Sequence, residues 1–283
     1  MTVRAENRCL MRCLLYAACA GALMLQAQTE DKGPAFEVAS VRRSASGRVP
    51  DVQFKNGRLS ASSVPLAILV SIAYNVPFQG PRLKGIDPEL GMETYDIQAM
   101  AAPGLVPEGA SQDASIAKLR PMLQVLLKDR FRLKIQAETG QQPVYQLIVG
   151  KSGPRLQKAK LSESECAADQ TRRCHRIGGG QGRGIHATAV DIGDLVRFVE
   201  NWTDRPLLDK TGLTGLYDIE TDGWVPLRPR MPTPGSSPEN DTMSDPTRPT
   251  LYMIFERLGL KMESSKAPVE MFVVEHLGRP TEN

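Results

Sequence analysis

Two short motifs carry the residue types of a serine acyl-enzyme. Ser115-Ile116-Ala117-Lys118 fits S-x-x-K, and Lys210-Thr211-Gly212 fits K-T-G. The chemistry needs the hydroxyl and the amine one helical turn apart, so that a base can take the hydroxyl proton. Pro121 favours the first turn of a helix, so we expect that helix to begin after Ser115, and Ser115 and Lys118 then need not share a face. The sequence therefore assigns no catalytic residue, and acyl-enzyme chemistry is kept as the alternative.

The second motif also belongs to a longer pattern with a simpler explanation. Asp209-Lys210-Thr211-Gly212 resembles the phosphorylated aspartate of ion-pumping ATPases, but Leu213 stands where that motif has threonine. Gly212 and Gly215 permit a positive φ just before a strand that starts at Leu216. We interpret the segment as a tight turn.

Two tyrosine–aspartate pairs join an acid to a phenol, a combination that can move protons. They are Tyr95-Asp96 and Tyr217-Asp218. Each pair falls in an expected strand, where alternation would bury the tyrosine and turn the aspartate toward a neighbouring turn or helix start. We predict a structural role for both pairs.

The cysteines and histidines offer one disulfide and no gathered metal site. A leader holds three of the five cysteines, which leaves Cys166 and Cys174 to form a disulfide in an oxidising compartment. A zinc site that adds His175 is the alternative, but this spacing matches no zinc knuckle. His186 and His276 fall in expected strands, so we assign no metal and no cofactor.

The elements that position these residues follow from an internal repeat. Tyr95-Asp96-Ile97 recurs as Tyr217-Asp218-Ile219, and the segment 129–135 recurs as 256–262. Segments that recur in the same order predict a duplicated building block.

Each copy is expected to run strand, helix, strand, helix and then a β-hairpin. The apolar face of the first helix consists of Leu66, Leu69, Val70, Ala73 and Tyr74. Asp191 is the expected N-cap of its counterpart. The hairpins would turn at Thr139-Gly140 and Ser265-Lys266. The sequence thus predicts an α+β fold, a tandem duplication of a β-α-β-α-β-β unit with helices packed on a mixed or antiparallel sheet.

The chain begins with a segment that is typical of an export signal. Basic residues precede an apolar run and a small-residue exit at residues 26–27, and the run is too short for a membrane anchor. A lipid anchor at Cys19 is the less favoured reading, because Tyr16 stands where a small aliphatic residue is wanted.

Removal of the leader lowers the charge. Without it, the 35 basic and 32 acidic residues become 32 and 31, a net charge of about +1. This balance gives no electrostatic reason to expect a nucleic acid partner. We expect a mature protein without an integral membrane span, periplasmic or secreted.

The expected organisation has four parts. Residues 1–27 form the signal peptide, 28–150 the first α+β unit, 151–183 a flexible linker with the disulfide, and 184–283 the second unit. Glycines at 178–180 and 182 make the linker poor in side chains that can be buried. Within the second unit, residues 225–249 form a Pro-rich surface loop.

Several segments carry a family resemblance. They are Phe36 to Val41, Leu126 to Phe131, Asp209 to Asp218, Pro268-Val269-Glu270 and Arg279 to Asn283. With them the chain resembles a family of exported proteins of unknown function, abundant in soil bacteria. In that family the same domain also appears as the C-terminal domain of membrane zinc peptidases of the β-lactam-sensor type. The resemblance implies an extracytoplasmic module and brings no activity.

Each half is also similar to the short N-terminal domain of secretins and TonB-dependent receptors. The similarity lies in Pro65-Leu66, which opens a helix, and in a later helix that leads into paired strands. It implies a periplasmic interaction module.

We therefore expect a non-catalytic binding or sensing module of the cell envelope, not an enzyme. Its partner would be an envelope protein, a peptide or a wall fragment. The alternative is a serine acyl-enzyme of the penicillin-recognising type that uses Ser115, Lys118 and Lys210.

Overall fold

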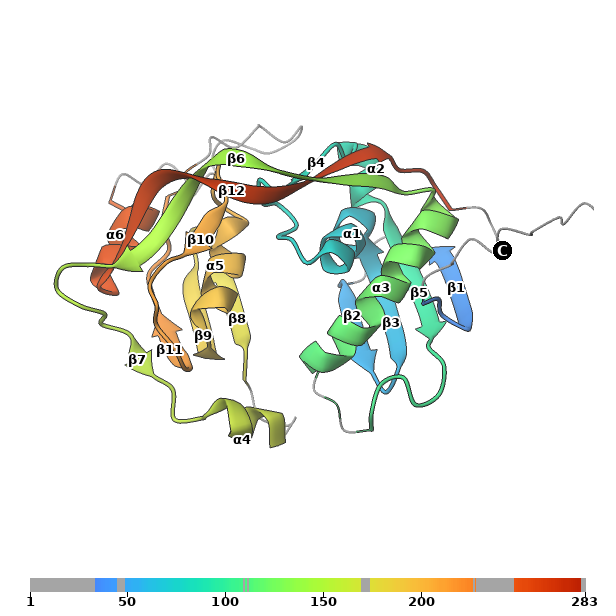
Figure 1. The fold of residues 1–283 in the computed structure, drawn as a ribbon, viewed down its shortest axis with the longest axis horizontal. Coiled ribbons are helices and arrows are strands. Elements are labelled where there is room, and N and C mark those ends of the chain that lie inside the picture. Colours follow the sequence, from blue (N-terminus) through green and yellow to red (C-terminus); the bar gives the residue numbers. More distant parts are fainter. Residues whose placement is uncertain are drawn as a thin grey trace, which may run out of the picture. The chain divides into compact units, whose positions relative to one another are not determined.

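The longest elements are two strands that pair with each other along their whole length. β6 (Lys134–Val149) and β12 (Leu260–His276) run antiparallel, from Leu260 opposite Val149 to His276 opposite Lys134. We call this pair the ribbon. Figure 1 shows β6 and β12 side by side. Two short parallel strands flank it, β10 (Leu207–Asp209) beside β6 and β4 (Leu83–Lys84) beside β12.

The computed structural model describes residues 34–44, 49–108, 110, 112–168, 174–225, 227 and 247–280. The expected signal peptide at 1–27, Cys19 and most of the Pro-rich loop at 225–249 lie outside these residues. Residues 33–283 belong to one compact unit. Helices packed on antiparallel and mixed sheets make it an α+β fold, as predicted.

The ribbon replaces the two predicted hairpins, and that prediction is wrong. Gly140 and Ser265, both in the expected turns, lie inside continuous strands opposite Val269 and Val144. The strand segments of the two expected hairpins exchange partners. The first half of β6 pairs with the second half of β12, and the second half of β6 pairs with the first half of β12. Neither Thr-Gly nor Ser-Lys is among the preferred two-residue hairpin turns. A long strand from elsewhere in the chain therefore outcompetes local closure.

One sheet precedes the ribbon in sequence. It contains β1 (Val38–Arg43), β2 (Asp51–Lys55), β3 (Arg58–Pro65) and β5 (Thr94–Met100), all antiparallel in the order β1-β5-β3-β2.

Three helices accompany this sheet: α1 (Leu66–Tyr74), α2 (Pro88–Met92) and α3 (Gln112–Phe131). Leu59, Leu69 and Leu123 are fully buried in the shared core, which we call the first core. Val274 of β12 packs into the same core, so one end of the ribbon belongs to it.

A second sheet has the corresponding order β7-β11-β9-β8. Its strands are β7 (Gln157–Lys158), β8 (Arg176–Gly180), β9 (Gly184–Val190) and β11 (Tyr217–Glu220).

The accompanying helices are α4 (Glu163–Ala168), α5 (Ile192–Glu200) and α6 (Leu251–Arg257). Trp224 and Phe255 are buried in this second core together with Leu147 and Met262 from the ribbon.

The segment at 151–183, expected to be a linker, contributes β7, α4 and β8 to this half. Its glycines have a packing role. A Cβ on Gly180 would lie 2.6 Å from Trp202, and one on Gly179 would lie 2.1 Å from the carbonyl oxygen of Gly184. At Gly179 and Gly180 the strand therefore passes too close to its neighbours to carry side chains, whereas Gly178 has open space around it.

Helix α3 also differs from the expectation. It begins at Gln112 and carries Pro121 in its interior, so Ser115 and Lys118 share one helix. The predicted start after Ser115 is wrong. Tertiary packing overrides the local preference of proline here, because Leu119 and Leu123 on either side of it are fully buried.

Both tyrosine–aspartate pairs hold the strand before a helix in place. Tyr95 and Tyr217 are buried. Asp96 accepts a hydrogen bond from the backbone N–H of Ser63 at 2.8 Å, and Asp218 accepts one from Ala189 at 2.9 Å.

The two acceptors serve equivalent backbone positions. Ser63 and Ala189 have φ of 52° and 47°, a left-handed conformation that is uncommon outside glycine. Both lie just before the helix that follows their strand. The same device thus occurs in both halves, while the duplication itself stays a prediction.

Removing either carboxylate leaves a backbone N–H at a left-handed residue without its side-chain acceptor. We expect Asp96→Ala and Asp218→Ala each to lower the free energy of unfolding by about 1–3 kcal/mol in urea denaturation. Gln98→Ala removes an exposed β5 side chain whose amide donates to the Ser60 hydroxyl at 2.8 Å on the surface, and it should lower the free energy of unfolding by no more than about 0.5 kcal/mol. Equal losses in the aspartate variants and this control would contradict the assigned role.

Candidate functional site

The motif residues of the acyl-enzyme alternative are not gathered. Ser115 is buried, with 1% of its surface exposed, whereas Lys118 is exposed on the same helix. Lys210 follows β10 in the other half, and its backbone N–H donates to the carbonyl of Leu147 at 2.8 Å. In the described part of the chain, no hydrogen bond links the three side chains.

Around Lys210 the chain forms a side-chain-supported turn. Asp209 Oδ1 accepts from the backbone N–H and the hydroxyl of Thr211, at 2.8 and 2.7 Å. Gly212 and Gly215 have φ of 66° and 91°. The turn accounts for these residue types without catalysis.

A cavity of about 440 Å³ lies at the centre of the ribbon. Gln142 and Pro143 of β6 and Met271 of β12 form its ribbon wall. The remaining lining residues are Gly80, Pro81, Leu83, Lys84, Asp204, Arg205 and Pro206. A lysine, an arginine, an aspartate and a glutamine amide therefore stand beside prolines and a methionine, so the lining offers both polar and apolar contacts.

Tyr145 fixes one wall of this cavity. Its hydroxyl donates to Asp204 at 3.0 Å, and the Arg205 guanidinium lies 5.4 Å from the centre of its ring. Burial, together with hydrogen bonds to Tyr252 and Asp204, raises the pKa of Tyr145. The phenol stays protonated at neutral pH and remains a donor to Asp204.

A buried ion pair adjoins two of the segments that line the cavity, at Pro81–Leu83 and at Pro206. Arg82 Nε lies 2.6 Å from Glu200 Oε1, and the Glu200 side chain is only 2% exposed. Glu200 also accepts the backbone N–H of Leu207 at 3.2 Å, and Arg82 donates to the Leu207 carbonyl at 3.3 Å. The pair joins the segment before β4 to α5 and β10, so it sets the position of both strands that flank the ribbon.

The outer edges of the ribbon are mostly open. β10 pairs only with Tyr145 to Leu147 of β6, and β4 pairs only with Phe272 and Val273 of β12. Over the rest of both strands, the described residues provide no further strand partner. Among the described residues these edges therefore lack a strand partner over most of their length, and such edges can pair with another chain.

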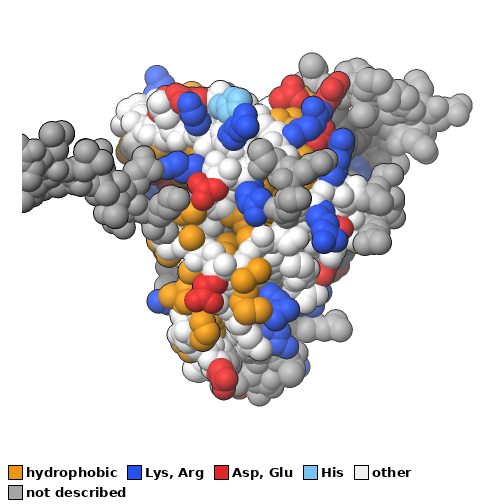
Figure 2. Space-filling model, turned by 90° about the vertical axis from the view of Figure 1, so that its right-hand side faces the viewer, with side chains coloured by type: hydrophobic (Ala, Val, Ile, Leu, Met, Phe, Trp, Pro, Cys, Tyr) orange, Lys and Arg blue, Asp and Glu red, His pale blue; other side chains and the backbone are white. Residues whose placement is uncertain are grey.

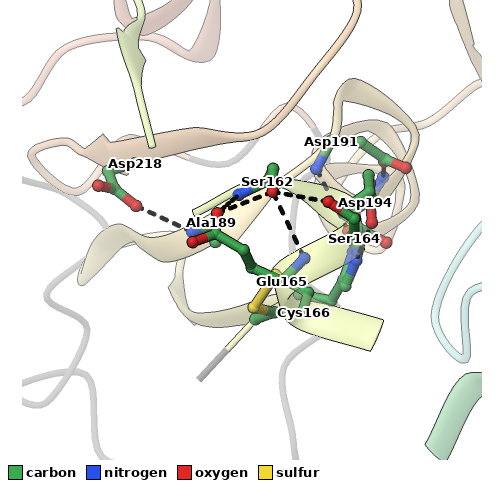
Figure 3. Close-up of a disulfide and its surroundings, with 11 residues drawn as sticks. Ser162, Ser164, Glu165, Cys166, Ala189, Asp191, Asp194 and Asp218 are labelled. Atoms are coloured by element: carbon green, nitrogen blue, oxygen red, sulfur yellow. Dashed lines mark hydrogen bonds and ion pairs between the residues drawn. A yellow bond between two sulfur atoms is a disulfide. The ribbon is translucent and has the colours of Figure 1, made fainter. Parts of the chain in front are cut away.

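The predicted disulfide is present. Cys166 of α4 is bonded to Cys174, with 5.8 Å between the two Cα atoms. Both sulfurs are used, which leaves no thiolate for the alternative zinc site with His175. Figure 3 shows this disulfide with Glu165 and Cys166 of α4, and with Asp191 and Asp194 at the start of α5.

His175, which the sequence left in a loop, lies in a cluster of carboxylates. Its Nδ1 is 2.6 Å from Asp194 Oδ2, and its Nε2 is 3.2 Å from Glu163 Oε2. Burial lowers the pKa of His175, but the hydrogen bonds and charges of Asp194 and Glu163 outweigh it and raise the pKa above the ordinary value. We missed this cluster from the sequence; the adjacency of His175 to a disulfide cysteine was the one available signal.

The predicted cap of α5 brings a third carboxylate to the cluster. Asp191 Oδ1 accepts a hydrogen bond from the backbone N–H of Asp194 at 2.6 Å. In return, Asp194 Oδ2 accepts one from the backbone N–H of Asp191 at 3.4 Å, and the two bonds form a capping box. His175, Asp191 and Asp194 line a second cavity of about 470 Å³.

Charge is mixed on the surface. Figure 2 shows one face of the molecule, on which basic and acidic side chains are interspersed among apolar ones. That face presents no continuous stripe of one sign. Of the helices that the structure describes, none has the length and apolar character needed to cross a membrane.

Comparison with known proteins gives one match. No curated protein and no solved structure matches the chain. Residues 67–277 match a family described as "Protein of unknown function (DUF3738)". This match runs from the second residue of α1 to the residue after β12. It includes the ribbon and the second core, whereas β1, β2 and β3 of the first sheet lie before it. The chain therefore belongs to this family of proteins of unknown function.

Proposed function

We propose that the protein is a non-catalytic binding or sensing module of the cell envelope, and that it binds an extended peptide segment of an envelope protein at the ribbon. The observation that carries this proposal is the open edge of β6 and β12 beside the central cavity. Extended peptides add to such edges as an extra strand, and adjacent pockets read alternate side chains.

The composition of the ribbon is typical of an edge that does not pair indiscriminately with other strands. Its central residues include Gln141, Gln142, Lys266 and Glu270. Charges and prolines on an edge discourage indiscriminate pairing between copies. Pro143 and Pro268 lie in the same stretch, where a missing N–H limits the length of strand that can be added on one side. Such an edge favours a specific partner over self-association.

Location in the envelope rests on the leader and the disulfide. Residues 1–27 have the pattern of an export signal, and Cys166–Cys174 is of the kind that persists in oxidising compartments. The resemblance to extracytoplasmic domains of zinc peptidases and to short domains of secretins points the same way. We propose a periplasmic or secreted protein; a wall fragment at the cavity is the other ligand consistent with its polar lining.

Photo-cross-linking in producing cells tests the peptide-binding edge. A photoreactive amino acid at Gln141, exposed in the centre of β6, should give a reproducible adduct with an envelope protein, identified by mass spectrometry. The same group at Lys128, exposed on α3, is the control and should not give that adduct. No adduct at Gln141, or the same adduct at both positions, would contradict binding at the ribbon.

Labelling with a fluorescent penicillin tests the alternative. Because Ser115 is buried, we expect no covalent labelling of the purified protein and no change in Ser115→Ala. A known penicillin-binding protein in the same gel serves as the positive control. Labelling of the parent protein that disappears in Ser115→Ala would show an acyl-enzyme and overturn the non-catalytic proposal.

A further inference from the structure

Three side chains from separate segments converge beside the disulfide. Glu163 opens α4, His175 follows Cys174, and Asp191 is the N-cap of α5. Each offers one ligand atom, and these atoms all lie within 4.8 Å of one another. A small closing movement of these side chains would let a single ion contact all three, because two zinc ligands can be at most about 4.2 Å apart.

The imidazole of His175 is oriented as in metal sites. Asp194 Oδ2 lies 2.6 Å from Nδ1 and accepts the proton of that nitrogen. A carboxylate at one ring nitrogen fixes the tautomer and presents the lone pair of the other nitrogen, the usual arrangement around metal-bound histidine. Here that other nitrogen is Nε2, which donates to Glu163 in the metal-free protein, so a bound ion would take the place of this proton.

The distance between Nε2 and Glu163 Oε2 fits two ligands of one ion. It is 3.2 Å. Two ligands of a tetrahedral zinc ion, each about 2.0–2.1 Å from the metal, are roughly 3.3 Å apart. Asp191 can take part without giving up its cap, because the cap uses Oδ1 and a carboxylate has a second oxygen.

The backbone around the cluster is held in place. The disulfide ties Cys166, three residues after Glu163, to the residue just before His175. His175 itself has a φ of 50°, and its N–H donates to the carbonyl of Ala189 at 2.9 Å. A constrained backbone and a cavity at the same place distinguish this cluster from carboxylates scattered on a surface.

We propose that Glu163, His175 and Asp191 bind a divalent first-row transition ion such as Zn²⁺, with Asp194 as the residue that positions the imidazole. One nitrogen and two oxygens suit zinc better than Mg²⁺ or Ca²⁺, which take oxygen ligands. Three protein ligands leave a coordination position for water or for a group of a bound ligand.

Calorimetric titration with ZnCl₂ of the protein purified after export from producing cells, without the three leader cysteines, tests the site once a chelator has been applied and removed. We expect one zinc ion per chain with the disulfide intact. His175→Asn should weaken binding at least tenfold; asparagine suits the left-handed backbone at this position. His186→Asn is the matched control, because His186 also contacts a carboxylate, Glu220, but stands outside the cluster, and its zinc affinity should equal that of the parent.

Two further substitutions separate ligand from positioning roles. Asp191→Asn keeps a good N-cap but loses the charged ligand, so binding should weaken while the thermal midpoint changes little. Asp194→Asn should weaken binding by about 10- to 100-fold without removing a ligand. NMR of the parent protein gives a readout that does not depend on any variant folding: zinc should shift the ¹⁵Nε2 resonance of His175.

The contribution of the disulfide is tested with Cys166→Ser/Cys174→Ser rather than by reduction, because free thiolates bind zinc themselves. We expect weaker zinc binding in this variant. The proposal is overturned if His175→Asn binds zinc as tightly as the parent, if His186→Asn is the variant that loses binding, or if zinc leaves the His175 resonance unmoved. Equal affinities for Ca²⁺ and Zn²⁺ would also overturn the proposal, because they would show binding by surface carboxylates without a histidine ligand.

Discussion

Antiparallel pairing of β6 with β12 connects the two cores of this protein. At one end of the ribbon, Val274 packs into the first core; at the other end, Leu147 and Met262 pack into the second. Each backbone hydrogen bond contributes only about 0.5–1.5 kcal/mol net, but β6 has 16 residues and β12 has 17. Neither core can be completed until both strands are paired, so the stability of one half is coupled to that of the other.

The same pairing positions both candidate sites. The cavity at the ribbon exists because β10 and β4 each cover only a short part of the long strands, and the buried Arg82–Glu200 pair sets where those short strands lie. Removing one partner of such a buried ion pair lowers the stability of the protein strongly, because the other charge is left buried without a counterion. The His175 cluster depends on the ribbon less directly, through α5, which packs on the second core.

Short-range signals in the sequence predicted much of the local structure. The apolar face of residues 66–74 corresponds to α1, and Asp191 caps α5 as expected. The disulfide could be predicted from composition, since only two of the five cysteines lie outside the expected leader. These features are determined by residues within a few positions of one another, which is the range over which pattern and spacing are informative.

Features that depend on distant partners were not predictable in the same way. Thr139-Gly140 and Ser265-Lys266 separate β-rich segments, but which strand each segment pairs with is decided by a partner more than a hundred residues away. The glycines at 178–180 predict a linker from composition, because the sequence does not show that the Trp202 ring packs against Gly180. His175 joins Asp194 and Glu163 only after α4, β8 and α5 are in place.

Cross-strand disulfide trapping tests the ribbon most directly. Thr139 and Glu270 are exposed and directly opposite each other in β6 and β12. Opposite residues of antiparallel strands have Cα atoms about 4.5–5.5 Å apart, within the range that a disulfide spans. In Thr139→Cys/Glu270→Cys, oxidation should produce a bond between these two positions within one chain, seen by peptide mapping of the monomer, while each single variant gives none. If the new pair stays reduced under conditions that oxidise Cys166 and Cys174, or bridges only between two chains, the ribbon does not form as described.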